Sequence, residues 1–208
     1  GGLMHTNIAA CTLFSATSGS SVATAATIGT VAIPNMRRMG YRAPLYLGSI
    51  AAGGTLGILI PPSINMILFG VLAEVSITQL YLAALIPGLM LACFFSLAVL
   101  VLCLIWPDID GTVTPATWYQ RIYALRALIP PIGLFVIVVG SIYAGFATPT
   151  EAAAIGVVAA LLIAAFGGGL TLATLGAALE GTMRTTAMVM LIVLAAFFLN
   201  FVMVSIGL

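Results

Sequence analysis

Long apolar stretches without charged residues follow one another along this chain, and short segments between them hold the charges. A membrane helix needs about 20 mostly apolar residues to cross roughly 30 Å of hydrocarbon. The stretches that are long enough to cross are 3–36, 43–73, 75–107, 127–150, 152–179 and 185–208. The pattern therefore predicts an all-α, polytopic membrane protein.

Hydroxyl residues crowd the first of these stretches. Between Thr12 and Thr30 it holds nine Ser and Thr residues, with Gly19 near the centre. Polar groups at membrane depth must find partners inside the protein. We therefore predict two short helices that meet at a polar tip, a re-entrant helical hairpin over residues 3–34. The alternative is a single crossing helix that packs through its small residues.

Glycines and prolines interrupt the second stretch near its middle. The glycines lie between Gly53 and Gly57, and Pro61-Pro62-Ser63 follows shortly after. Two adjacent prolines remove two amide donors and the glycines add backbone freedom, so we expect the helix over 43–73 to unwind at mid-membrane. Freed carbonyls coordinate cations, and the N-termini of half-helices attract anions. The alternative is a kink that binds nothing.

The charged segments suggest how the chain is oriented. We interpret residues 34–42 as a short loop, which holds three of the six arginines and is therefore predicted to be cytoplasmic. Residues 118–126 combine aromatic and basic side chains, and we interpret them as an interfacial arm. Thr148 and Glu151 have the spacing of a capping box, although an acid beside apolar runs is also a candidate proton or cation site.

Composition places most of this chain in lipid. It is 62% hydrophobic and 5% charged, whereas soluble domains carry about 25% charged residues. Six basic and five acidic residues nearly cancel, so there is no basic field for nucleic acid. The three cysteines lie in apolar runs without metal or disulfide spacing, and we interpret them as packing residues.

Catalytic chemistry lacks its usual side chains here. His5 is the only histidine, which disfavours a Ser/His intramembrane protease built on a tip serine. No cluster has metal-ligand spacing and no P-loop is present. We therefore predict a non-enzyme without a cofactor. A hydroxyl-rich hairpin tip, a broken helix and the lack of a buried charge pair favour a carrier that uses neutral oxygens over a channel lined by charged rings.

Several short motifs, in their order along the chain, resemble a known family. They are Ser18-Gly19-Ser20-Ser21, Ile33-Pro34, Arg38-Met39-Gly40-Tyr41, Ile60-Pro61-Pro62-Ser63, Ile86-Pro87-Gly88 and Thr148-Pro149-Thr150-Glu151-Ala152-Ala153. This ordered set is similar to the large membrane (DctM-type) subunit of tripartite ATP-independent periplasmic (TRAP) transporters, over essentially the whole chain. The chain begins without Met and ends inside an apolar run, so we expect an internal fragment of such a subunit.

The resemblance implies an elevator-type ion-transporter-like fold, in which each of two inverted repeats supplies a hairpin and an unwound helix. Residues 1–73 then form one half of the transport domain, with the re-entrant hairpin at 3–34 and the broken helix at 43–73. Residues 74–208 supply further transmembrane helices and the interfacial scaffold arm. The second hairpin and second broken helix are missing, so these 208 residues are not expected to transport alone.

The resemblance also implies a sodium site and half of a substrate site between the hairpin tip and the broken helix. The implied sodium-binding residues are Ser18, Gly19, Ser20, Ser21, Gly54, Thr55 and Gly57. The implied substrate-binding residues are Ser20, Ser21, Pro61, Pro62 and Ser63. No catalytic residue and no metal beyond sodium as the coupling ion is expected.

The implied function is secondary active import of an organic acid, such as a C4-dicarboxylate or a sialic acid, with sodium across the bacterial inner membrane. The implied partners are a small membrane subunit and a periplasmic substrate-binding protein, with lipid around the protein and no nucleic acid. The alternatives are another sodium- or proton-coupled anion transporter, a passive channel, and a structural membrane subunit. The residues do not select one organic acid.

Overall fold

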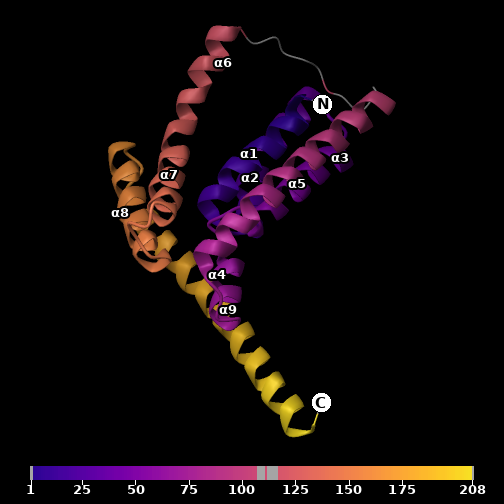
Figure 1. The fold of residues 1–208 in the computed structure, drawn as a ribbon. Coiled ribbons are helices and arrows are strands. Elements are labelled where there is room, and N and C mark those ends of the chain that lie inside the picture. The colour runs from indigo at the N-terminus through magenta and orange to yellow at the C-terminus, as the bar shows by residue number, and fades with distance from the viewer. Residues whose placement is uncertain (1, 107–110, 112–116, 208) are drawn as a thin grey trace. The chain divides into compact units, whose positions relative to one another are not determined.

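The computed structural model describes residues 2–106, 111 and 117–207, and every regular element in these ranges is helical. The chain divides into two compact units, Gly1–Val158 and Ala159–Leu208. The helices, labelled in Figure 1, are α1 (Gly2–Ser18), α2 (Ser21–Met39), α3 (Ala43–Thr55), η1 (Leu56–Ile58), α4 (Ile64–Leu72), α5 (Ile77–Ile105), α6 (Trp118–Leu125), η3 (Arg126–Leu128), α7 (Ile129–Tyr143), α8 (Pro149–Phe166) and α9 (Leu172–Ser205).

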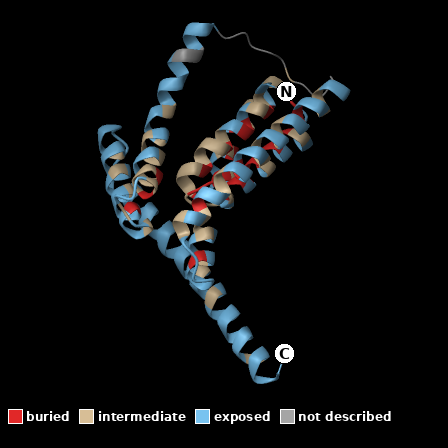
Figure 2. Cartoon of the chain, viewed as in Figure 1, coloured by how far each residue is buried: buried red, intermediate tan, exposed pale blue. Residues whose placement is uncertain are grey.

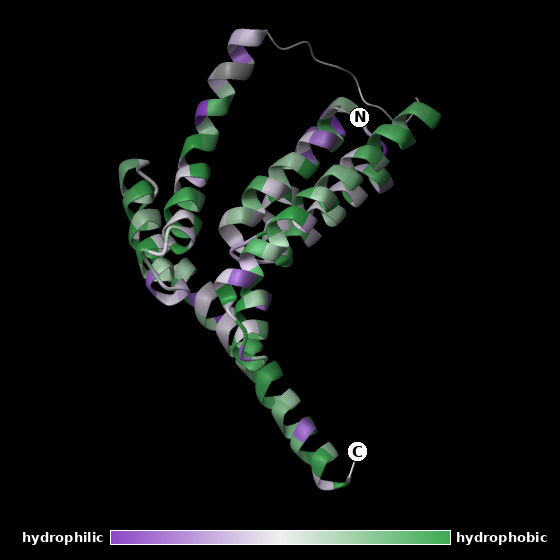
Figure 3. Ribbon diagram, viewed as in Figure 1, coloured by the Kyte–Doolittle hydropathy of each residue, from purple (hydrophilic) through white to green (hydrophobic). Residues whose placement is uncertain are grey.

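Four helical segments in the described ranges are long and apolar enough to cross a membrane. They are Ile77–Ile105, Trp118–Tyr143, Pro149–Phe166 and Leu172–Ser205. Figure 3 shows α5 as a nearly continuous apolar helix, whereas α1 and α2 mix apolar with polar residues. The segments agree with the predicted all-helical, multi-pass membrane protein.

The first apolar stretch forms two helices. α1 ends at Ser18, α2 begins at Ser21, and Gly19 turns the chain between them with a φ of 62°. The two helices pack against each other, and α3 packs against both (Figure 1). These residues therefore form a helical hairpin, while its re-entrant position in a membrane stays a prediction.

α3 runs parallel to α1, in a register that two contacts define. The Asn7 side chain donates a hydrogen bond from Nδ2 to the Ser49 hydroxyl at 3.1 Å. One turn further along both helices, Gly53 lies so close to Cys11 that a Cβ on the glycine would be 2.8 Å from the Cys11 Cβ. A glycine is therefore required where these helices approach each other most closely.

α3 runs antiparallel to α2, because it runs parallel to α1 and the two arms of a hairpin run in opposite directions. The buried Tyr46 hydroxyl donates to the Ala32 carbonyl oxygen at 3.1 Å, near the open end of the hairpin. Towards the tip, a Cβ on Gly54 would be 2.7 Å from the Ala25 Cβ. α3 is therefore held between the two arms along its length.

Many buried residues of the first unit lie where the hairpin, α3 and α5 meet, and Figure 2 shows further buried segments elsewhere in this unit. One cluster contains Met4, Ile8, Ala32, Met36, Tyr41, Tyr46, Ile50 and Val99. A second cluster contains Tyr81, Ile142 and Ala152, from α5, α7 and the start of α8. Apolar packing thus links the hairpin to α5, and α5 to α7.

The capping box before α8 is confirmed. The Glu151 carboxylate accepts a hydrogen bond from the Thr148 backbone amide at 2.8 Å, and the Glu151 amide donates to the Thr148 hydroxyl at 3.4 Å. A helix start therefore accounts for the position of this acid.

The second unit contains the end of α8 and the 34-residue helix α9, which has no buried residue. At 1.5 Å per residue α9 is about 51 Å long, more than the roughly 30 Å of hydrocarbon that a span must cross. Its early turns hold an exposed ion pair between Arg184 and Glu180 at 3.2 Å. Part of α9 therefore extends beyond the depth of one crossing.

The register of α3 predicts a difference between two glycine substitutions. Gly53→Ala is expected to destabilise the full-length protein, because its Cβ would meet Cys11 at 2.8 Å. Gly48→Ala in the same helix meets nothing within 4 Å and is expected to stabilise it by up to about 1 kcal/mol through helix propensity. Thermal unfolding in matched lipid or detergent measures both, and equal effects would contradict this register.

Candidate functional site

The candidate site lies where the chain between α3 and α4 loses its helical structure. Residues 59–63 are not helical, and α4 begins again at Ile64. Pro61 and Pro62 have no amide hydrogen to donate, which explains why the helix stops here. The Ser63 hydroxyl donates to the Ile58 carbonyl oxygen at 2.8 Å and so bridges the break. The predicted interruption of this helix is confirmed.

The tip of the hairpin touches this break through backbone atoms. A Cβ on Gly19 would lie 2.7 Å from the Pro62 carbonyl oxygen, and the Ile64 amide donates to the Gly19 carbonyl oxygen at 3.4 Å. A Cβ on Gly57 would lie 2.6 Å from the Ser20 carbonyl oxygen. Because the opposing atoms belong to the backbone, rotating a side chain cannot relieve either clash.

A third glycine extends this contact along α2. A Cβ on Gly54 would lie 3.3 Å from the Ser21 carbonyl oxygen, in addition to its close approach to Ala25. Glycines therefore line the tip contact from both sides, with Gly19 on the hairpin and Gly54 and Gly57 on the broken helix.

Hydroxyl groups and one carbonyl oxygen converge inside the tip. The hydroxyls of Ser18 and the buried Thr24 are 2.8 Å apart, and Thr24 also donates to the Ser20 carbonyl oxygen at 2.8 Å. The Ser20 hydroxyl caps α2 by accepting from the Ala23 amide at 3.3 Å. The tip thus holds a small cluster of neutral oxygen atoms that are hydrogen-bonded to one another.

Ser15 has a buried hydroxyl without a partner. Its side chain is 0% exposed, and in the described residues only the Ser15 and Tyr143 hydroxyls are buried without a hydrogen bond. Ser15 is one turn after Cys11 in α1, and Gly57 is one turn after Gly53, which Cys11 contacts. The same register therefore places Ser15 beside Gly57, just before the tip. A buried, unsatisfied hydroxyl costs about 1–3 kcal/mol, so a ligand or water at this level would relieve a real penalty.

The structure brings together most of the residues that the resemblance assigned. Those at the contact between tip and break are Ser18, Gly19, Ser20, Ser21, Gly54, Gly57, Pro62 and Ser63. Pro61 is buried in the break. Thr55 is exposed, and its hydroxyl donates to the Ala52 carbonyl oxygen at 2.6 Å within its own helix. Ser63 is fully buried, and its hydroxyl is occupied by Ile58.

Sequence reasoning overlooked three residues at this site. Ser15 and Thr24 belong to the hydroxyl-rich stretch, one helical turn before Gly19 and one turn after Ser20, so helical spacing from the tip was the signal that pointed to them. Tyr81 of α5 is fully buried, and its hydroxyl has a hydrogen bond with the Ser63 backbone. Nothing in the local sequence of α5 indicates this contact.

The named residues of the site carry no charge. No group of three or more His, Cys, Asp and Glu residues that could hold a metal occurs among the described residues. The first turn of α4 begins at the break, and amides in a first helical turn have no partner within their helix. The arrangement therefore offers oxygen atoms to a cation on one side and amides to an anion on the other.

These features define a class: a multi-pass helical membrane protein with an uncharged site at a hairpin tip and a broken helix is suited to carry solutes. The family model described as "Tripartite ATP-independent periplasmic transporter, DctM component" matches residues 1–208. The chain therefore belongs to the DctM family of TRAP transporters. The members of this family are transporter permease subunits and not enzymes, in agreement with the expectation from the sequence.

Curated relatives are named for transport of different substrates. The chain is 39% identical to the ectoine TRAP transporter large permease protein of Halomonas elongata, over 78% of this chain and 38% of the relative. It is 36% identical to the C4-dicarboxylate TRAP transporter large permease protein of Rhodobacter capsulatus, over 100% of this chain and 50% of the relative. It is 35% identical to the sialic acid TRAP transporter large permease protein of Vibrio cholerae, over 93% of this chain and 45% of the relative. The chain spans at most half the length of these relatives.

The tip geometry predicts a difference between two glycines that share a left-handed backbone. Gly19→Ala and Gly40→Ala both force an alanine into a positive φ, 62° and 72°, which costs roughly 1–2 kcal/mol. Only Gly19→Ala also meets a backbone oxygen at 2.7 Å, whereas Gly40 has nothing within 4 Å. Thermal unfolding of the full-length protein should therefore show the larger loss for Gly19→Ala. Equal losses would mean that the tip does not touch the break.

Proposed function

We propose that the full-length protein is the large permease subunit of a secondary active transporter that imports a carboxylate-bearing organic solute with sodium across the bacterial inner membrane. The observation that carries this proposal is the backbone contact between the Gly19 tip and the break at Pro62, surrounded by neutral oxygens. Membrane carriers commonly place ions and substrates at broken helices near mid-membrane. The elevator-type fold and the re-entrant position of the hairpin belong to the same proposal.

The oxygen atoms at the tip fit a sodium ion. Sodium in carriers is coordinated by backbone carbonyls and hydroxyls at unwound helices. The Ser20 carbonyl oxygen and the hydroxyls of Ser18 and Thr24 already converge, and the unpartnered Ser15 hydroxyl lies one turn below. Bound there, sodium would supply a positive charge beside the first turn of α4. These residues, with Ser21, Gly54 and Gly57 around them, are our proposed sodium site.

The proposed substrate site adjoins the sodium site at the break. Ser20 and Ser21 supply polar groups from the tip, and residues 61–63 lead into α4, whose first-turn amides favour a carboxylate. Three of the relatives are named for ectoine, C4-dicarboxylates and sialic acid, and each of these substrates carries a carboxylate. No arginine lies in the hairpin tip or the break to bind a second anionic group.

Sodium and substrate should bind with positive coupling. The tip and the break share backbone contacts at Gly19 and Gly57, so an ion that orders one of them also orders the other. A substrate that then binds loses less conformational entropy, and by linkage it raises sodium affinity equally. The partners that we propose are a small membrane subunit and a periplasmic protein that delivers the substrate.

Uptake of radiolabelled organic acids into proteoliposomes tests this function. The vesicles hold the complete transporter, with or without its binding protein and with or without an inward sodium gradient. Uptake that requires both would support the proposal. Uptake driven by a proton gradient would indicate another coupled anion transporter, and uptake that requires neither gradient nor binding protein would indicate a channel.

Ser20→Ala keeps the Ser20 carbonyl oxygen but loses the hydroxyl that caps α2, which costs about 1 kcal/mol and loosens the turn that positions this carbonyl. Ser20→Ala, and Ser21→Ala beside it, are therefore expected to weaken the sodium dependence of uptake by raising the sodium concentration required for half-maximal rate. Ser76→Ala is the matched control, because the Ser76 hydroxyl caps α5 in the same way by accepting from the Gln79 amide at 3.4 Å. An unchanged sodium dependence in both tip variants would overturn this part of the site.

Ser15→Ala separates a ligand role from a packing role by the sign of its effect. Without sodium the variant should be as stable as the wild type or more so, because it removes a buried hydroxyl that has no partner. With sodium the variant should lose part of the stabilisation that sodium binding gives. For an intact site this stabilisation is about 2.7 kcal/mol when the sodium concentration is a hundred times its Kd.

Thermal unfolding of the full-length protein in sodium and in choline measures this difference. Ser141→Ala is the control, because the Ser141 hydroxyl already donates to the Val138 carbonyl oxygen at 2.8 Å. If sodium stabilises Ser15→Ala as much as it stabilises the wild type, Ser15 does not belong to the sodium site.

A further inference from the structure

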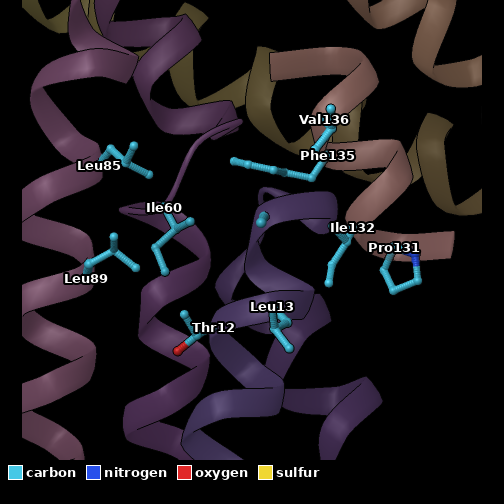
Figure 4. Close-up of a pocket in the computed structure, with 10 residues that line it drawn as sticks. Thr12, Leu13, Ile60, Leu85, Leu89, Pro131, Ile132, Phe135 and Val136 are labelled. Atoms are coloured by element: carbon cyan, nitrogen blue, oxygen red, sulfur yellow. The ribbon is translucent and has the colours of Figure 1, made fainter. Parts of the chain in front are cut away.

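A cavity of about 450 Å³ lies in the first unit, behind the hairpin tip (Figure 4). α1 contributes Leu13 and Ala16 to its wall and the break contributes Ile60. Figure 4 shows Leu89 of α5 on one side of the space and Phe135 of α7 on the other. Its volume falls within the range of sites that bind small molecules.

The cavity is lined almost entirely by apolar groups. Thr12 is its one hydroxyl residue, and that hydroxyl donates to the Ile8 carbonyl oxygen at 2.8 Å in its own helix. A polar ligand would find no free partner on the remaining apolar side chains, and cavities of this kind do not hold water well. The chemistry of the lining therefore selects a hydrocarbon.

The position of the cavity along the helices indicates where such a hydrocarbon comes from. Both α5 and the Trp118–Tyr143 segment are candidate membrane spans. Phe135 lies about 12 Å from the nearer end of its span, and Leu89 lies about 18 Å from the nearer end of α5, at 1.5 Å per residue. At such depths the surrounding solvent is lipid tails, which are abundant and have the chemistry that the lining selects.

We propose that this cavity binds the acyl chain of a membrane lipid, which enters from the hydrocarbon layer. Ala16 is three residues before Gly19, and Ile60 directly precedes Pro61. The acyl chain would therefore lie against the hairpin arm and beside the break, at the tip end of the hairpin. It would support the tip contact from behind without using any group of the proposed ion site.

A photoreactive lipid tests the proposal. The probe is a phosphatidylcholine with a diazirine near the end of one acyl chain, added at increasing mole fraction to proteoliposomes of the full-length transporter. Peptide mass spectrometry then locates the adducts. Leu13 lines the cavity and is half-buried, whereas Ile86 does not line it and is 68% exposed. Bulk lipid therefore reaches Ile86 freely, whereas a chain in the cavity reaches Leu13. Labelling of Leu13 should saturate, and labelling of Ile86 should rise in proportion to the probe.

Cavity variants give the control. Ala16→Leu fills the space and should abolish labelling at Leu13 without changing labelling at Ile86. Ala9→Leu places the same side chain two turns away, at an exposed position of α1 that does not line the cavity, and should leave both unchanged. Phe135→Ala enlarges the space and should preserve or increase labelling at Leu13, so the test does not depend on one variant folding.

Two results would overturn the proposal. Absence of Leu13 adducts in the full-length protein would mean that another part of the longer chain fills the cavity. Labelling that rises in proportion to the probe and is insensitive to Ala16→Leu would mean that the cavity holds no bound chain. Neither result depends on transport, so failure here leaves the sodium-coupled uptake experiment unaffected.

Discussion

The close backbone approach between the hairpin tip and the broken helix is the constraint on which the rest of this structure depends. Lipid tails are as apolar as leucine side chains, so burial of apolar surface does little to hold helices together inside a membrane. Close van der Waals packing and hydrogen bonds must do so. Gly57 against Ser20 and Gly19 against Pro62 provide this packing at distances that admit no Cβ. The same contacts form the candidate site, so stability and site geometry rest on the same atoms.

The two ends of the hairpin are held in different ways. At the open end, side chains make specific hydrogen bonds, such as Tyr46 to Ala32 and Asn7 to Ser49, and an apolar cluster surrounds them. At the tip, backbone contact and a few hydroxyls hold the chain, and the Ser15 hydroxyl has no partner. The open end is therefore fixed by satisfied groups, whereas the tip retains unsatisfied capacity for a ligand.

Local chemistry made two parts of the site predictable from the sequence. Gly19 lies near the centre of a hydroxyl-rich stretch, and Pro61-Pro62 removes consecutive amide donors, so the turn and the break followed from residue type alone. The pairing between them followed only from the family resemblance, because the Gly57 contact with Ser20 joins residues far apart in the sequence. Thr55 and Gly57 differ by two positions, and helical phase alone puts one on the exposed face and the other against the tip. The contact of Tyr81 with Ser63 depends on the position of α5, which no local pattern encodes.

The difference between the two hairpin ends also bears on how ligand binding would act on the fold. The His5 Nδ1 and Ser96 Oγ atoms are hydrogen-bonded at 2.6 Å, so α1 is attached to α5 near the open end as well. A change at the tip therefore cannot move the hairpin as a free body without breaking satisfied hydrogen bonds, each worth about 0.5–1.5 kcal/mol. The less costly response is local: the residues from Ser15 to Thr24 adjust against the break while the arms stay in place. Because Gly19 and Gly57 allow no gap between tip and break, such an adjustment is passed directly to the first turn of α4.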